Sequence, residues 1–287
     1  MLWLLAVVVD IFLETAIALY LRRTAKQTTL SPIISTAITY VLGVLPIAVG
    51  YALLQREQIS IPTPPATLWI ACASICFVIA NILIFRVYTK LDASLYTTIN
   101  TSKYIVILVV ASLIIGDKLT AQQMAGAVVI LFSSAAISYI FGRSKQAKAP
   151  SHYIALAFFA SFIVALAQLS ERMALGLVSS TTYILLGWGL QALLLGAFAA
   201  KSILRLRPSK VQERPLVIIG LMRGIAGVCI VYALATTQNI SLIAPLAAAK
   251  VVTIALASFV LLGERSHLAA RIGAAVTALI GVLLIIA

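Results

Sequence analysis

Residues 94–129 read SLYTTINTSKYIVILVVASLIIGDKLTAQQMAGAVV, and residues 241–276 read SLIAPLAAAKVVTIALASFVLLGERSHLAARIGAAV. Both stretches begin with Ser-Leu, carry a lysine at the tenth position and have two glycines at matching places. The offset from Lys103 to Lys250 is 147 positions. The chain therefore contains one segment twice, which predicts two structurally related halves.

The two lysines are the unusual feature of this repeat, because each lies well inside an apolar run. A run of this length predicts a membrane span, and its tenth residue then lies near the bilayer midplane. A charge placed there costs about 3 kcal/mol or more unless it has a partner or faces water. Lysines at two equivalent points therefore indicate either a functional site or pairing with buried acids.

The composition is that of an integral membrane protein. The chain is 62% hydrophobic and 10% charged over 287 residues, which leaves almost no room for a soluble domain. Because a span takes about 20 apolar residues, we predict an all-α integral membrane fold with ten transmembrane helices. The ten segments are 2–21, 29–53, 67–89, 93–115, 121–141, 152–178, 181–200, 215–236, 241–262 and 268–286.

The net charge of +13 does not indicate a nucleic-acid partner, because most Lys and Arg residues lie in short loops, where they set membrane topology. Cys72, Cys76 and Cys229 lie inside apolar runs without a His cluster, so we expect no disulfide, metal or cofactor. The first apolar run follows Met1 directly and carries two acids. We expect it to be a first span and not a cleaved signal.

Basic residues gather in alternate loops. The clusters at 22–26, 86–90, 143–148, 201–214 and 265–271 all follow odd-numbered spans. By the positive-inside rule these loops face the cytoplasm, and both termini face away from it. We expect a multi-pass protein of the cell inner (plasma) membrane.

A polar, basic linker at 142–151 divides the chain into a first five-helix repeat, 1–141, and a second, 152–287. With an odd number of spans in each half, the second half enters the membrane in the opposite sense. We therefore predict two inverted five-helix repeats. Substrate sites in transporters of this kind lie near the midplane at the repeat interface, where Lys103 and Lys250 are expected.

Further ionisable residues lie within predicted spans. Asp10 and Glu14 are four apart and share a helical face, Glu171 is the predicted counterpart of Glu14, and Arg223 lies in the eighth span. In one interpretation each base pairs with an acid and holds helices together. In the other, the lysines and Arg223 bind an anionic group in a water-filled cavity, while Asp10, Glu14 and Glu171 serve proton coupling or gating.

Polar neighbours of Lys103 extend the predicted substrate site. Asn100 and Tyr96 lie three and seven positions before Lys103, on its helical face. Single polar residues in other spans are more typical of contacts between helices than of a ligand site; they are Asn81, Tyr104, Gln168, Trp188, Gln191 and Tyr232.

Two features of the later spans bear on helix shape and packing. Pro245, five residues before Lys250, removes a helical hydrogen bond and predicts a kink in the ninth span. Gly220, Gly224 and Gly227 in the eighth span predict the close approach of a neighbouring helix.

With these features in place, the whole chain resembles members of the drug/metabolite transporter superfamily of the ten-helix kind with two EamA domains. The resemblance rests on the five-plus-five arrangement and on a Gly-acid-base turn that closes the fourth and ninth spans, followed by a glycine. These motifs are Gly116-Asp117-Lys118 with Gly126, and Gly263-Glu264-Arg265 with Gly273. The resemblance implies a transporter and not an enzyme.

Two narrower likenesses concern the site. Glu14, followed by Arg22, is similar to the first-helix glutamate of the small multidrug resistance family, which exchanges cations for protons. Lys103 and Lys250 resemble the lysines with which phosphate-sugar and nucleotide-sugar antiporters hold a phosphate. The first likeness implies a cationic substrate and the second an anionic one.

We therefore expect a secondary active transporter, an exporter or exchanger, that moves a small polar, anionic or zwitterionic metabolite by alternating access. Lys103, Lys250 and Arg223 would neutralise this small-molecule substrate, and Glu14 would carry a proton. Two alternatives stay open: proton-coupled efflux of cationic or amphipathic compounds through Glu14 and Glu171, and flipping of a lipid-linked phosphate. We expect a monomer in contact with the lipid bilayer, and leave a homodimer open.

Overall fold

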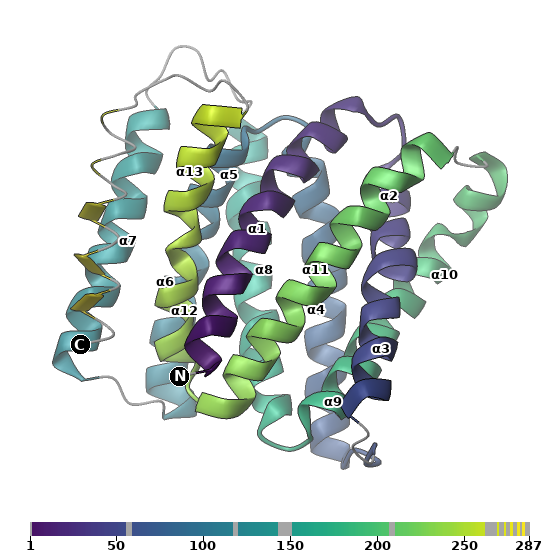
Figure 1. Ribbon diagram of the computed structural model, residues 1–287, viewed down its shortest axis with the longest axis horizontal. Helices are drawn as coiled ribbons and strands as arrows, with labels where there is room; N and C mark the ends of the chain where they lie inside the picture. Colours follow the sequence, from purple (N-terminus) through teal and green to yellow (C-terminus); the bar gives the residue numbers. More distant parts are fainter. Residues whose placement is uncertain are drawn as a thin grey trace.

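The computed structural model describes residues 2–55, 59–116, 120–142, 151–206, 210–261 and, beyond these, 269, 273, 276, 277, 280, 281, 283 and 284. Within these residues every regular element is a helix (Figure 1). Most of the predicted linker, most of the tenth predicted span, and residues 117, 118 and 263–265 of the Gly-acid-base motifs lie outside the described residues.

The first half of the chain forms five apolar helical segments, three of them single helices and two of them composite. The single helices are α1 (Leu2–Gln27), α4 (Pro64–Tyr88) and α7 (Ala121–Gly142). The composite second span is α2 (Pro32–Thr39), the π-helical turn η1 (Tyr40–Val44) and α3 (Leu45–Gln55), and the composite fourth span is α5 (Ala93–Asn100), α6 (Ser102–Val110) and the π-helical turn η2 (Ala111–Ile115).

The second half follows the same plan. Its single helices are α8 (Ser151–Leu175) and α11 (Lys210–Thr237), its composite seventh span is α9 (Ser180–Tyr183), the π-helical turn η3 (Ile184–Trp188) and α10 (Gly189–Leu206), and its ninth is α12 (Ile240–Ala248) and α13 (Lys250–Leu261). Side-chain caps begin the second and seventh spans, because Ser31 accepts from the N–H of Ile34 and Ser179 from that of Thr182.

Seven helical segments of the described residues are long and apolar enough to cross a membrane. They are Leu2–Gln27, Pro32–Gln55, Pro64–Tyr88, Leu95–Leu113, Ser151–Leu175, Ser180–Arg205 and Glu213–Thr237. The fifth and ninth predicted spans contain shorter apolar helices, Met124–Ser133 and Ile240–Ile254. Because the tenth lies mostly outside the described residues, a count of ten spans stays a prediction.

The exterior is apolar and the interior holds charges, which is the reverse of a soluble protein. Phe12 is 66% exposed, Phe132 70% and Phe198 65%, whereas Asp10 is 3% exposed and Lys103 4%. An apolar exterior on helices of this length is stable when lipid is the solvent. The chain is therefore a multi-pass membrane protein.

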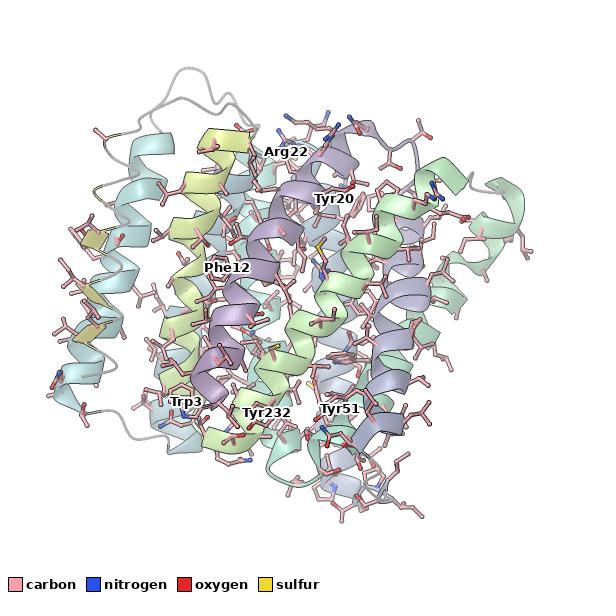
Figure 2. All side chains as sticks on the ribbon, viewed as in Figure 1. Trp3, Phe12, Tyr20, Arg22, Tyr51 and Tyr232 are labelled. Atoms are coloured by element: carbon pink, nitrogen blue, oxygen red, sulfur yellow. The ribbon has the colours of Figure 1, made fainter. Side chains whose placement is uncertain are left out.

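The two ends of the bundle differ in their side chains. Figure 2 places Trp3, Tyr51 and Tyr232 near the end where the chain begins, and Arg22 near the opposite end. Tryptophan and tyrosine favour membrane interfaces, and arginine favours the cytoplasmic side. Which side of the membrane each end faces stays a prediction.

Contacts between the two halves are symmetric: a contact between two spans recurs when each span is replaced by its counterpart in the other half. α1 packs along α11 and α8 packs along α4, so the first span meets the eighth and the sixth meets the third. α5 packs against α13 and α6 against α12, so the fourth and ninth spans run antiparallel (Figure 1). An inverted repeat requires this arrangement, although the complete repeat stays a prediction.

Both lysine-bearing spans are interrupted immediately before their lysine. α5 ends at Asn100 and α6 begins at Ser102, while α12 ends at Ala248 and α13 begins at Lys250. The repeat therefore extends from sequence to backbone conformation: each lysine lies in the first turn of a half-length helix.

A proline is not needed for these interruptions. Pro245 precedes the break in the ninth span, but Thr98 stands at the matching position of the fourth span, which is broken as well. At the break in the fourth span, the N–H of Tyr104 donates to the carbonyl of Thr101 at 3.0 Å, three residues back and not four. The predicted effect of Pro245 is therefore not the common cause.

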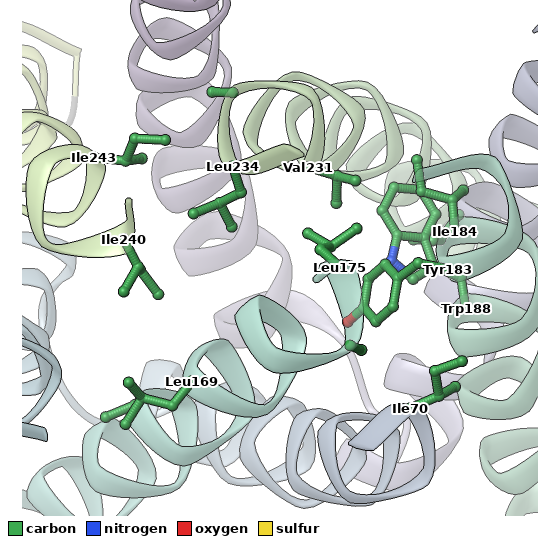
Figure 3. Close-up of a cluster of buried hydrophobic side chains, with 14 of the residues drawn as sticks. Ile70, Leu169, Leu175, Tyr183, Ile184, Trp188, Val231, Leu234, Ile240 and Ile243 are labelled. Carbon is green, nitrogen blue, oxygen red and sulfur yellow. The ribbon is translucent and has the colours of Figure 1, made fainter. Parts of the chain in front are cut away.

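Two apolar clusters fill the two ends of the interior. The cluster in Figure 3 includes Leu175, Tyr183, Trp188, Leu234 and Ile240, together with Val7 of α1. The second includes Ile34, Phe85, Leu91 and, on the same α1, Leu21. On α1 the first cluster includes Val7 and the second begins at Ile17, ten positions or about 15 Å of helix further on.

The eighth span packs closely through its glycines. A Cβ atom on Gly43 of η1 would lie 2.5 Å from the Cα of Gly220 in α11, and a Cβ on Gly220 would collide with the carbonyl of Thr39. Gly224 and Gly227 are crowded in the same way by side chains of neighbouring spans. The predicted close packing at these three glycines is confirmed.

We predict that Gly220→Ala lowers the melting temperature of the purified protein in detergent, because the new methyl group pushes α11 away from the second span. Overpacking of this kind costs about 1–3 kcal/mol. Gly189→Ala is the matched control, because nothing lies within 4 Å of the Cβ that it would add. Equal melting temperatures for the two variants would contradict the backbone contact.

Candidate functional site

A cavity of about 190 Å³ lies where the two apolar clusters meet, because Tyr40 and Trp188 of the first cluster and Ile17 and Tyr88 of the second line it. Its walls come from η1, η3 and helices α1, α4, α5, α6, α8, α10, α11, α12 and α13. All the residues that the sequence assigned to substrate binding or coupling line this cavity: Asp10, Glu14, Tyr96, Asn100, Lys103, Glu171, Arg223 and Lys250. The structure brings the set together, and the roles of its members stay predictions.

Lys250 is held by two carboxylates of one helix. Its Nζ lies 3.4 Å from Oε2 of Glu14 and 4.0 Å from Oδ2 of Asp10. Asp10 and Glu14 are one turn apart on α1, which packs against α13, so both acids reach the same lysine. Oδ2 of Asp10 is buried and accepts no hydrogen bond from the described residues. We call these three residues the α1–α13 triad.

Lys103 is placed differently from its repeat partner. It is 4% exposed, and its Nζ lies 4.9 Å from the centre of the Tyr104 ring, a cation–π distance. Among the described side chains, no carboxylate lies within 4.0 Å of Lys103. The two equivalent lysines therefore differ: Lys250 has acidic partners, and Lys103 presents its charge to the cavity.

Arg223 is oriented by neutral groups. Its NH1 donates to Oδ1 of Asn81 at 2.5 Å, while Nδ2 of Asn81 donates to the Tyr40 hydroxyl at 2.8 Å and to the Phe77 carbonyl at 2.7 Å. In the part of the chain that is described, Arg223 forms no ion pair. Asn81 therefore positions a guanidinium without neutralising it, which leaves a second cation facing the cavity.

Glu171 and several neutral groups complete the polar lining. Glu171 is 5% exposed and lies beside Tyr183. Five lining side chains each bury a polar atom that has no hydrogen-bond partner among the described residues: Tyr96, Asn100, Tyr104, Gln168 and Gln191. A buried polar group without a partner costs about 1–3 kcal/mol. These atoms are therefore suited to hydrogen bonds with a ligand.

The backbone stays helical across both breaks. Thr101 (φ −67°, ψ −19°) and Ala249 (φ −57°, ψ −19°) keep right-handed helical dihedral angles. The positive charge at the two positions therefore comes from the lysine side chains.

Arg22 lies outside the cavity. It is 5% exposed, pairs with Asp92 at 2.7 Å and donates to the carbonyl of Tyr88 at 2.6 Å. These contacts tie the end of α1 to the connection between α4 and α5. Glu14 lines the cavity and Arg22 does not. The two residues that resemble the small multidrug resistance family therefore do not share one site.

Comparison with known proteins agrees with this architecture. Residues 1–139 match the model of the EamA-like transporter family. The chain belongs to the drug/metabolite transporter superfamily. A solved crystal structure of another protein, 17% identical in sequence, superposes with a TM-score of 0.72 over 98% of this chain and 95% of its own, and this likeness extends to the fold alone. A search of the curated proteins found no match.

Sequence reasoning missed several residues of this EamA-like cavity. Asn81, Tyr104, Gln168, Trp188 and Gln191 were interpreted as contacts between helices, yet all line the cavity, whereas Tyr232 does not. Tyr40 and Tyr88 also line the cavity and were not among the predicted residues.

A repeated signal could have identified Tyr40. Thr39-Tyr40 leads into η1 and Thr182-Tyr183 leads into η3, so the same dipeptide precedes or begins the π-helical turn of each half. Both tyrosines are buried. An internal comparison of the second and seventh spans would have found this pair.

We predict that Lys250→Met lowers the melting temperature more than Lys250→Met/Glu14→Gln. The single variant leaves the buried Asp10 and the partly exposed Glu14 without a base, and breaking a fully buried ion pair costs about 3–5 kcal/mol. The double variant removes one of those charges. Lys201→Met, at an exposed position of α10, is the control and leaves the melting temperature unchanged. Equal effects of the single and double variants would contradict the ion pair.

Proposed function

We propose that the chain is a secondary active transporter, an exporter or exchanger, of a small polar metabolite with a negatively charged group. The observation that carries this proposal is the pair of cations without acidic partners in the described part of the cavity, Lys103 and Arg223. A carboxylate or phosphate group satisfies both, and a guanidinium can hold such a group through two hydrogen bonds. An added positive group on the substrate, as in a zwitterion, would face Glu171.

The size of the cavity supports a small substrate. Its volume of about 190 Å³ lies below the roughly 300–1,000 Å³ that is usual for drug-sized ligand pockets. Apolar side chains such as Phe77, Val164 and Trp188 share the walls with the charged groups. The substrate therefore combines one charged group with a compact body that tolerates apolar contacts.

Alternating access follows from the position of the cavity. An apolar cluster lies on either side of the cavity along the helix axes. In alternating access, the helices around one cluster separate and open the cavity to one side of the membrane, and those around the other cluster then open it to the opposite side. In our proposal, the ten spans form two inverted repeats that rock about this site in the inner membrane. The protein works without a cofactor and catalyses no covalent change.

The runner-up is proton-coupled efflux of a cation through Glu14. Its support is the side chain of Glu14, which is 29% exposed and lines the cavity. In this alternative Lys103 has no part in substrate recognition. A flippase for a lipid-linked phosphate would use the same cations as our proposal but would bind only phosphates that carry a lipid chain.

We predict that small anions raise the melting temperature of the purified protein and that Lys103→Gln abolishes this response. A ligand at one hundred times its dissociation constant stabilises the native state by about 2.7 kcal/mol. The panel comprises carboxylates, phosphorylated metabolites, amino acids, organic cations and a short-chain lipid phosphate, and Lys201→Gln serves as the control for loss of a lysine.

The results separate the three alternatives. Stabilisation by water-soluble anions that is lost in Lys103→Gln and kept in Lys201→Gln supports our proposal. Stabilisation by cations alone, lost in Glu14→Gln, selects the efflux mechanism, and a response only to the lipid phosphate selects the flippase.

A further inference from the structure

The α1–α13 triad restricts what an anion can do in the cavity, and the inference drawn from it rests on the proposed function. Lys250 is the only base of the triad and lies 3.4 Å from Glu14 and 4.0 Å from Asp10. All three residues line the cavity. An anion that approaches Lys250 therefore also approaches two carboxylates of α1.

Electrostatics makes this approach unfavourable while both carboxylates are ionised. Like charges within a few ångströms repel strongly where the effective dielectric constant is well below that of water. A proton on Asp10 or Glu14 removes one negative charge and releases Lys250 from part of its pairing. The same proton therefore both lowers the repulsion and frees a cation for the anion.

We propose that binding of an anionic substrate in this cavity is coupled to uptake of one proton by the Asp10–Glu14 pair, so that the anion and the proton are carried together. Coupling between two ligands is reciprocal, so a bound anion also raises the affinity of the pair for a proton. The triad thus favours co-transport, whereas a cation that competed with the proton for Glu14 would be exchanged against it.

The unpartnered oxygen of Asp10 supports the pair as the place of the proton. Oδ2 of Asp10 is buried, faces Lys250 at 4.0 Å, beyond hydrogen-bond distance, and accepts no hydrogen bond from any described residue. One base neutralises the nearer of two carboxylates better than the more distant one. The more distant carboxylate, that of Asp10, therefore takes up a proton at the lower cost in free energy.

The other half of the chain cannot substitute for the triad. Glu171 is the predicted counterpart of Glu14. It is the single acid that α8 contributes to the cavity, whereas α1 contributes two, and in the described part of the chain it forms no ion pair with Lys103. Coupling is therefore confined to the first and ninth spans. Lys103 and Arg223 hold the anion whether or not the Asp10–Glu14 pair carries the extra proton.

The charged and titratable groups that face the triad come from five neighbouring elements. They are Lys103 and Tyr104 of α6, Arg223 and Cys229 of α11, Tyr40 of η1, Tyr88 of α4 and Tyr96 of α5. None of these is a carboxylic acid. Among the groups that line the cavity, Glu171 is the other acid that the test has to separate from the triad.

Sulfate is the probe for the test, because its charge does not change between pH 5.5 and pH 8. We expect the dissociation constant of sulfate for the purified full-length protein to fall as pH is lowered, by up to about tenfold per pH unit if one proton is taken up. Calorimetry in buffers of different ionisation enthalpy measures the proton uptake on the unmodified protein directly.

Asp10→Asn/Glu14→Gln is the test variant, and Asp10→Asn alone replaces it if the double variant does not fold, because Asp10 is the carboxylate where the proton is expected. We expect sulfate to bind the variant with the same dissociation constant at both pH values. Glu213→Gln, at the start of α11 and outside the cavity lining, keeps the pH dependence of the parent.

The outcomes separate the coupling from the proposed function. Sulfate binding to the parent without proton uptake, or a pH dependence that persists in the double variant, overturns the coupling and leaves the anion site intact. Absence of sulfate binding to the parent at both pH values overturns the anion site and the coupling together.

Discussion

A charge in the hydrocarbon layer is stable only beside a partner or a polar cavity. Six ionisable side chains lie within the spans that line the cavity, three acidic and three basic: Asp10, Glu14, Glu171, Lys103, Arg223 and Lys250. They come from α1, α6, α8, α11 and α13, and each avoids the lipid by facing the same space. The requirement to shelter these charges therefore fixes how five helices are rotated about their axes, and the apolar clusters then fill the ends of the bundle.

The repeat and the spans could be read from the sequence because both depend on local pattern. A lysine at the tenth position of two similar stretches indicated related segments, and these segments pack antiparallel as α5–α6 and α12–α13. The π-helical turns and the breaks before Lys103 and Lys250 could not be read in this way. The residue at the matching position does not explain the breaks, since Thr98 and Pro245 precede the same kind of break.

The members of the site were predictable, and their pairing was not. Any ionisable residue deep in a span is driven to the interior, which is why all the predicted site residues meet in one cavity. Which acid reaches which base depends on the packing of α1 against α13, which no residue spacing encodes. The same limit hid Asn81, because its contacts with Tyr40 and Arg223 join three spans that are distant in sequence.

The π-helical turns at Tyr40–Val44 and Ile184–Trp188 make the second and seventh spans sensitive to insertion and deletion. Each such turn accommodates one residue more than an α-helical turn, and one residue corresponds to about 100° of helical rotation. Loss of a single residue here would turn α3 or α10 by that angle relative to the helix before it. Leu53 and Leu54, now 73% and 83% exposed, would then face a different direction, so the number of residues in these spans is constrained as tightly as their identity.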